Sequence, residues 1–96
     1  MNDYIKMISD FPVNRKLKSA LNKFFNKYDY MLDECIFRKN WEGANYALII
    51  EGSSLFHHLN GYSGSWDIHT EFYNAFDKCG FHPEMMNSCV VAFYKD

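Results

Sequence analysis

The residues best suited to chemistry are histidines and cysteines in the second half of the chain. They are His57, His58, His69, His82, Cys79 and Cys89. Thiolate and imidazole are the usual zinc donors, and Cys79 and His82, with two residues between them, form the one compact pair. A second such pair is missing, and neighbouring residues of a strand, the state expected for His57 and His58, point to opposite faces. We therefore expect no metal site and no cofactor.

A covalent nucleophile would be a serine or cysteine activated by a nearby base. The run Gly52-Ser53-Ser54 lacks the G-x-S-x-G spacing of a nucleophile elbow and is better explained as a turn. Cys79 and Cys89 fall on expected apolar faces, where cysteine is normally an unreactive small hydrophobe. These patterns indicate that the protein is not an enzyme, and a small metal-dependent enzyme ranks third among the functions considered.

Glycines at 61 and 64 resemble part of a phosphate-binding loop. They stand just before an expected helix, where main-chain N–H groups favour anions. Asp67 and Glu71 follow them, however, in place of the lysine that such loops carry. The segment 61–65 is therefore interpreted as a connector.

Aromatic side chains make up 19% of the 96 residues, with nine Phe, seven Tyr and two Trp. A domain of this size buries only somewhat more than about 60% of its unfolded surface, so the core is small. The excess of rings predicts a contact surface for a protein partner, because aromatic residues are enriched at interface centres. The residues expected to form it are Trp41, Phe56, Tyr62 and Trp66, together with the carboxylates of Glu51, Asp67 and Glu71.

Charge is divided unevenly along the chain. Residues 1–40 carry eight basic and five acidic side chains, a net charge of +3, and residues 41–96 carry two basic and seven acidic, a net charge of −5. The alternative function is nucleic-acid binding through the basic second helix, on which Lys18 and Lys23 occupy outer faces. No dense Lys/Arg run supports it, so a nucleic-acid partner is disfavoured.

The fold is expected to be organised around residues 45–60. Two runs rich in β-forming residues flank Gly52-Ser53, and glycine at the first central position suits a two-residue type II′ turn. These features predict a hairpin of two antiparallel strands, Tyr46–Glu51 and Ser54–Leu59. Every other element is expected to cover this hairpin.

Two helices precede the expected hairpin. Asp3 or Asn2 caps a short first helix, which Pro12 ends because the residue before a proline avoids the α region. Asn14 caps a second helix, along which apolar residues recur at i, i+4, i+7 and i+11 over 17–28.

The segment 29–41 is ambiguous, because short apolar runs fit both helical and strand periods. A helix continuing to Phe37 is favoured. The alternative is an edge strand over Cys35–Lys39 with a turn over Asn40–Asn45.

A third helix and a third strand complete the expected fold. Ser65 or Asp67 caps the helix, which runs to about Cys79 with Gly80 behind it, and 87–94 reads as a buried strand. The resulting order is α-α-β-β-α-β. A crossover helix makes the third strand parallel to the second, and placing the third strand beside the first leaves the first central. The expected fold class is α+β: a two-layer sandwich with helices on one face of a small three-stranded, mostly antiparallel sheet.

Length and cysteine usage bound the setting of the protein. The 96 residues are expected to form a single domain, without a signal peptide or membrane span. Three unpaired cysteines argue against a secreted disulfide scaffold and favour the reducing cytoplasm. The thinly covered face of the sheet and a possible edge strand further predict self-association, most simply as a homodimer.

These observations together favour a small binding module that acts by protein–protein contact. A chain of this size without catalytic machinery fits an inhibitor or immunity-type protein that occludes a larger target. The most concrete version is an antagonist of a host nuclease encoded by a phage or mobile element, such as an anti-CRISPR protein. This expectation is an analogy from size and composition.

Overall fold

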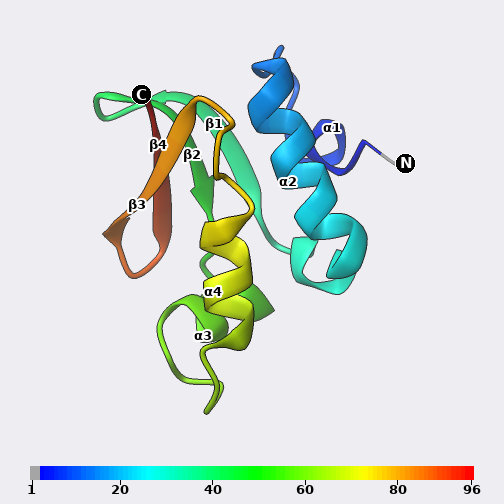
Figure 1. The fold of residues 1–96 in the computed structure, drawn as a ribbon, viewed down its shortest axis with the longest axis vertical. Coiled ribbons are helices and arrows are strands. Elements are labelled where there is room, and N and C mark those ends of the chain that lie inside the picture. The colour runs from blue at the N-terminus through cyan, green and yellow to red at the C-terminus, as the bar shows by residue number, and fades with distance from the viewer. Residues whose placement is uncertain (1–2) are drawn as a thin grey trace.

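A computed structural model describes residues 3–96 and confirms the α+β class (Figure 1). The helices are α1 (Tyr4–Ile8), α2 (Arg15–Lys27), the 3₁₀ turn η1 (Asp29–Leu32), α3 (Ser54–Leu59) and α4 (Asp67–Asn74). The strands are β1 (Ile36–Trp41), β2 (Ala44–Ile49), β3 (Phe81–Asn87) and β4 (Val90–Lys95). No helix among the described residues is long and apolar enough to cross a membrane.

The expected order α-α-β-β-α-β with three strands is wrong, because the sheet has four strands in the order β1-β2-β4-β3. All three strand pairs are antiparallel, and each outer strand forms a hairpin with its sequence neighbour. The parallel strand pair that we expected is therefore absent among the described residues. The expected placement of the last strand beside the strand that begins near Tyr46 is confirmed, since β2 and β4 are the central pair.

The expected hairpin across Gly52-Ser53 is wrong. Strand β2 ends at Ile49, and the segment expected as the strand Ser54–Leu59 is helix α3. Gly52 has a φ of +81°, as a turn requires, but Ser53 after it is the helix N-cap. A glycine and a serine serve a hairpin turn and a helix start equally well, so the local signal did not distinguish them.

The favoured helix from 29 to Phe37 is also wrong, and the edge-strand alternative is close to the structure. Helix α2 ends at Lys27, η1 follows, and β1 begins at Ile36. Glu42 and Gly43 both have positive φ, +46° and +89°, as a type I′ turn between two strands requires.

The third expected helix stops earlier than predicted. Helix α4 ends at Asn74 rather than near Cys79, and β3 was missed. Pro83 within β3 obscured the strand signal, because proline cannot donate to a sheet ladder and is found on edge strands. Strand β3 is such an edge, and a bulge lies between Met85 and Asn87.

The first two helices begin where the sequence predicts. The Asp3 side chain accepts a hydrogen bond from Lys6 N, whereas Asn2, the alternative cap, lies outside the described residues. The Asn14 side chain accepts from the N–H groups of Lys16 and Leu17. The apolar stripe of α2 is buried from Leu17 through Phe24, so this helix lies on the core as expected.

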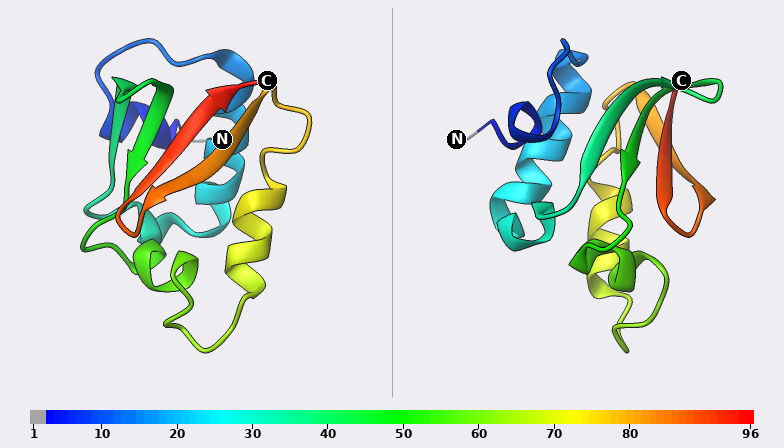
Figure 2. Two further views of the ribbon diagram at one scale, coloured as in Figure 1. Left: turned by 90° about the vertical axis from the view of Figure 1, so that its left-hand side faces the viewer. Right: turned by 180° about the vertical axis from the view of Figure 1, so that it is seen from behind.

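Both views of Figure 2 place the helices behind one face of the sheet, with α3 beyond the end of the sheet opposite the β1–β2 turn. Phe37, Leu48, Val91 and Phe93 extend from that face into the core and are buried. The opposite face, which we call the open face, has no described element over it. It carries the alternate residues of the same strands.

Candidate protein-binding surface

The N-terminus of α3 is fixed by Ser53, which is buried. Its hydroxyl donates to the carbonyl of Ile50 at 2.6 Å and accepts from the N–H of Phe56 at 3.4 Å. Leu55 and Leu59, four residues apart, are buried as a result. The other side of this short helix presents Phe56, which is half-buried, and His57, which is exposed.

The loop from α3 to α4 folds back on itself. Tyr62 N donates to the carbonyl of His57 at 2.8 Å, and Ser65 Oγ accepts from Asp67 N at 3.2 Å. The N-cap of α4 is Trp66, so the prediction that Ser65 or Asp67 caps this helix is wrong. Gly61 has a φ of +78°, and a Cβ atom there would lie 2.6 Å from the Trp66 ring. The Trp66 indole therefore lies across Gly61, in space that only glycine leaves open.

Six rings lie on α3, α4 and their connecting loop, in two groups of three. The centroids of Trp66 and His69 are 4.8 Å apart, those of His69 and Tyr73 4.8 Å, and those of Phe56 and Tyr62 6.1 Å. Tyr62 is 72% exposed and Trp66 57%. We call this the aromatic surface, and its members are Phe56, His57, Tyr62, Trp66, His69 and Tyr73.

Sequence reasoning found three members of the aromatic surface and missed the others. His57 escaped notice because residues 54–59 were expected to be a strand. His69 and Tyr73 follow Trp66 by three and seven residues, so all three lie on one side of the helical turns of α4. That spacing was a usable signal. Burial raises the pKa of Tyr73, which keeps its hydroxyl protonated.

The other expected contact residues do not join this group. Trp41 ends β1 at the β1–β2 turn, at the opposite end of the molecule from α3 in Figures 1 and 2, and its side chain is half-buried. Its indole Nε1 is buried without a hydrogen-bond partner among the described residues. Glu51 is exposed between β2 and α3, and Asp67 is exposed at the start of α4.

Glu71 faces the body of the protein. It lies 2.8 Å from Lys27 Nζ and accepts a hydrogen bond from the Tyr28 hydroxyl. Both donors lower the pKa of Glu71, and the pKa values of Lys27 and Tyr28 are raised in turn. These contacts attach α4 to the end of α2, so the helix that carries Trp66 is anchored on its other side.

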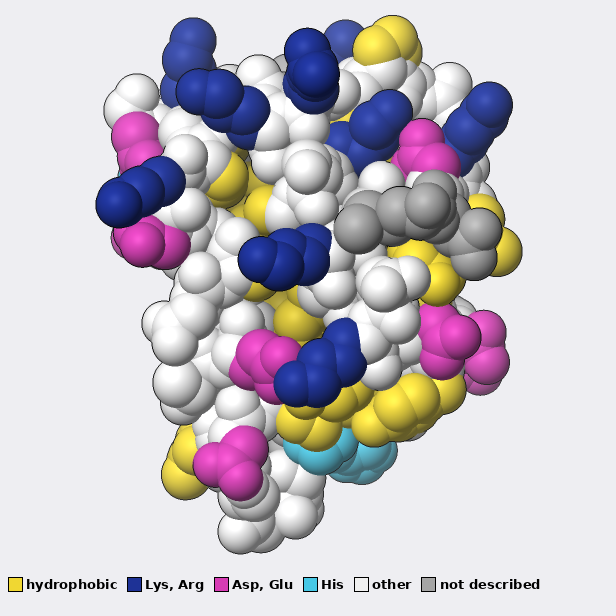
Figure 3. Space-filling model, turned by 45° about the vertical axis from the view of Figure 1, so that its right-hand side comes forward, with side chains coloured by type: hydrophobic (Ala, Val, Ile, Leu, Met, Phe, Trp, Pro, Cys, Tyr) yellow, Lys and Arg dark blue, Asp and Glu magenta, His cyan; other side chains and the backbone are white. Residues whose placement is uncertain are grey.

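The basic helix α2 is partly neutralised by neighbours. Figure 3 shows Lys and Arg side chains spread over the face that carries α1 and α2, with carboxylates between them. Lys18 forms an ion pair with Asp3 at 3.2 Å, and Lys27 is paired with Glu71. Lys23 is exposed and forms no ion pair with a described residue.

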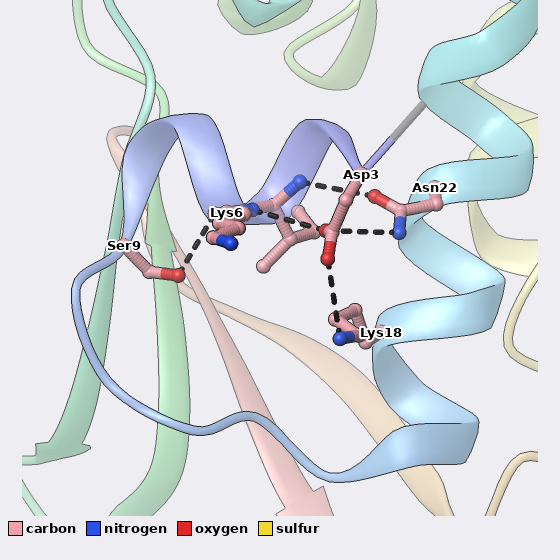
Figure 4. A network of polar contacts seen from close by, with 6 residues as sticks. Asp3, Lys6, Ser9, Lys18 and Asn22 are labelled. Atoms are coloured by element: carbon pink, nitrogen blue, oxygen red, sulfur yellow. Dashed lines mark hydrogen bonds and ion pairs between the residues drawn. The ribbon is translucent and has the colours of Figure 1, made fainter. Parts of the chain in front are cut away.

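Asp3 belongs to a polar cluster that docks α1 on α2 (Figure 4). The buried Asn22 side chain donates to Asp3 at 3.2 Å and accepts from Ile5 N at 3.0 Å. Burial opposes ionisation of Asp3, but hydrogen bonds from Asn22, Lys6 N and Lys18 outweigh it and lower its pKa. The cluster thus uses Lys18 to join two helices.

The expected chemical residues do not converge. Within residues 3–96 no group of three His, Cys, Asp or Glu side chains is placed to hold a metal ion. Cys79 donates to the carbonyl of Phe81 at 3.3 Å, whereas His82 Nδ1 lies 2.6 Å from Asp96. Burial raises the pKa of the Cys35 thiol to about 11, so the reactive thiolate form is disfavoured at neutral pH.

Comparison of the chain with protein-family models, curated proteins and solved structures found no match. The functional argument therefore depends on the geometry of the molecule itself. The aromatic surface is its most distinctive feature, since Tyr62 and Trp66 are two of the five large apolar side chains exposed within residues 3–96.

Proposed function

We propose that this protein is a binding module that recognises another protein through the aromatic surface. The observation that carries the proposal is the exposure of Tyr62 and Trp66, each next to another ring, Phe56 for Tyr62 and His69 for Trp66. Exposed aromatic groups cost solvation, and they supply most of the energy at the centres of protein interfaces. Their support by Gly61 and by the anchored helix α4 limits the entropy lost on binding.

The chemistry around the surface favours a protein over a nucleic acid. Asp67 is exposed beside Trp66, and no lysine or arginine belongs to α3, α4 or their connecting loop. A surface that stacks on bases also needs cations to follow the phosphate backbone. The lysines lie instead on α2, where Lys18 and Lys27 are already paired with carboxylates.

The more specific version of the proposal is an inhibitor or immunity-type protein that occludes a larger target, such as a phage or mobile-element antagonist of a host nuclease. Support comes from the shape of the molecule: a compact body with α3 and the loop that follows it, which carries Tyr62 and Trp66, at one end, an arrangement that suits insertion into an apolar pocket. If the aromatic surface inserts into an apolar pocket, the affinity for the partner should change little with salt concentration. Mimicry of a nucleic-acid backbone would instead be steeply salt-dependent.

The test is affinity capture from the native cell followed by titration of the purified partner. Trp66→Ala should weaken binding about 30-fold or more, the size expected of a central aromatic contact. The matched control is Met7→Ala, because Met7 is 72% exposed, as Tyr62 is, but lies on α1, which packs on α2 and β1. It should bind as the wild type does.

The proposal fails if Trp66→Ala and Tyr62→Ala both retain wild-type affinity while circular dichroism shows that they are folded. It also fails if the purified protein shifts single-stranded DNA at low salt and Lys23→Glu abolishes that shift. The second result would establish nucleic-acid binding through α2 instead.

A further inference from the structure

The open face of the sheet carries a row of side chains with opposite charges at its two ends. The antiparallel register aligns Arg38 on β1, Ala47 on β2, Ala92 on β4 and Glu84 on β3 across the full width of the sheet. Arg38 and Glu84 are exposed, whereas the two alanines between them are buried by their neighbours. From β1 to β3 this charged row therefore carries a cation, two small side chains and an anion.

An apolar row runs beside the charged one. Ile36 on β1 pairs with Ile49 on β2, which pairs with Val90 on β4. Ile36 is 40% exposed and Ile49 is half-buried. Apolar side chains on an uncovered face are commonly the centre of an interface.

We propose that a second copy of this chain covers the open face. The two copies are related by a twofold axis that lies between the stacked sheets, runs parallel to the strands and passes over the gap between β2 and β4. This axis reverses the order of the charged row in the second copy. Arg38 then lies over the partner subunit's Glu84, and Glu84 over the partner subunit's Arg38. The same operation places Ile49 over the partner subunit's Val90, and no large side chain stands between the two charges in the row. The row is thus complementary to itself, as an isologous interface requires.

The sheet edges are less suitable for self-association than its face. Strand β3 contains Pro83 and a bulge, and β1 carries Arg38 and Lys39, features that discourage edge-to-edge pairing. The face offers roughly 400 Å² per subunit, taking four strands about 4.8 Å apart and six residues at about 3.3 Å each. A typical stable interface buries about 800 Å² per partner, so the dimer should be weak and concentration-dependent.

Sedimentation equilibrium of the full chain tests the dimer. The wild type should pass from 11.4 kDa toward twice that mass as concentration rises. Arg38→Glu and Glu84→Arg each set like charges against one another twice and should weaken the dimer about tenfold or more. The double variant Arg38→Glu/Glu84→Arg restores both opposite-charge pairs and should recover the dimer.

Lys39→Glu is the matched control, because it makes the same charge change on the next residue of β1 but on the other side of the strand. It should leave the dimer unchanged. A wild type that stays monomeric up to about 1 mM would overturn the proposal, since that places the affinity below any useful range. A folded double variant that fails to recover the dimer would also overturn it. If Trp66→Ala made the dimer dissociate, the contact between the two copies would lie on the aromatic surface, and the dimer proposed here would be wrong.

Discussion

Two tryptophans of one chain show how position decides the role of a residue. Trp66 lies across Gly61, with more than half of its surface in solvent, whereas Trp41 is half-buried at the β1–β2 turn. The amino-acid type alone made both equal candidates for a contact surface. Only the backbone around each one separates them, because a glycine supports the first and a strand end holds the second.

Glu71 is the residue whose titration reports on the placement of the aromatic surface. Lys27 and Tyr28 lower its pKa below the unfolded value of 4.5, so its contribution to stability is complete above pH 4.5. That contribution disappears as the pH falls through the lower folded-state pKa. Glu71→Gln should therefore reduce the free energy of unfolding at pH 7 and match the wild type in acid.

Urea denaturation across this pH range measures the effect of Glu71→Gln. The control variant is Glu42→Gln, which removes an exposed carboxylate at the β1–β2 turn, away from the junction of α2 and α4. A difference between wild type and Glu71→Gln that stayed constant from neutral to acid pH would show that the carboxylate charge has no part in holding α4.

At the scale of elements, turn chemistry decides where strands pair. The sequence contains two glycine turns, at Gly43 before β2 and at Gly52 after it, and the hairpin was expected at the wrong one. Gly43 joins β1 to β2, and Gly52 leads into α3. Residues 54–59 carry Leu55 and Leu59, a spacing that fits an alternating strand as well as one face of a helix.

What the sequence did predict were elements with two agreeing signals. Helix α2 has both its Asn14 cap and a long apolar stripe, and the structure confirms it. Strand β3 has only a weak alternation interrupted by Pro83, and it was missed. In the candidate site, the predicted Phe56, Tyr62 and Trp66 lie in the aromatic surface, and the contacts from Trp66 to His69 and on to Tyr73 follow the helical spacing of α4, a signal that the sequence prediction did not use.

The β1–β2 turn offers a direct test of this assignment. Glu42 has a φ of +46°, which non-glycine residues rarely adopt, and a type I′ turn prefers asparagine followed by glycine. Glu42→Asn should therefore raise the free energy of unfolding by about 0.5–1 kcal/mol in chemical denaturation. Gly43→Ala, with φ at +89°, should lower it by about 1 kcal/mol or more. A destabilised Glu42→Asn variant would contradict the type I′ assignment.

In the whole molecule, the two faces of the sheet differ in what covers them. One face, with Phe37, Leu48, Val91 and Phe93, holds the helices and forms the core. The other carries the self-complementary charged row and is free to meet a second copy. Helices α3 and α4, which carry most of the aromatic surface, are not on the open face, and Phe56 and Tyr73 pack against the core. The proposed dimer and the proposed partner contact therefore use different residues.

The position of α3 beyond one end of the sheet has a consequence for how tightly the proposed dimer would hold its target. An axis parallel to the strands leaves both copies of Tyr62 and Trp66 at the same end of the dimer. The dimer can therefore bind an immobilised or repetitive target bivalently. Arg38→Glu should then dissociate markedly faster from a densely coated surface than the wild type, by about 100-fold or more. The affinity of Arg38→Glu for a single target molecule in solution should equal that of the wild type. Equal dissociation rates of the two proteins from the densely coated surface would show that the wild type does not bind bivalently.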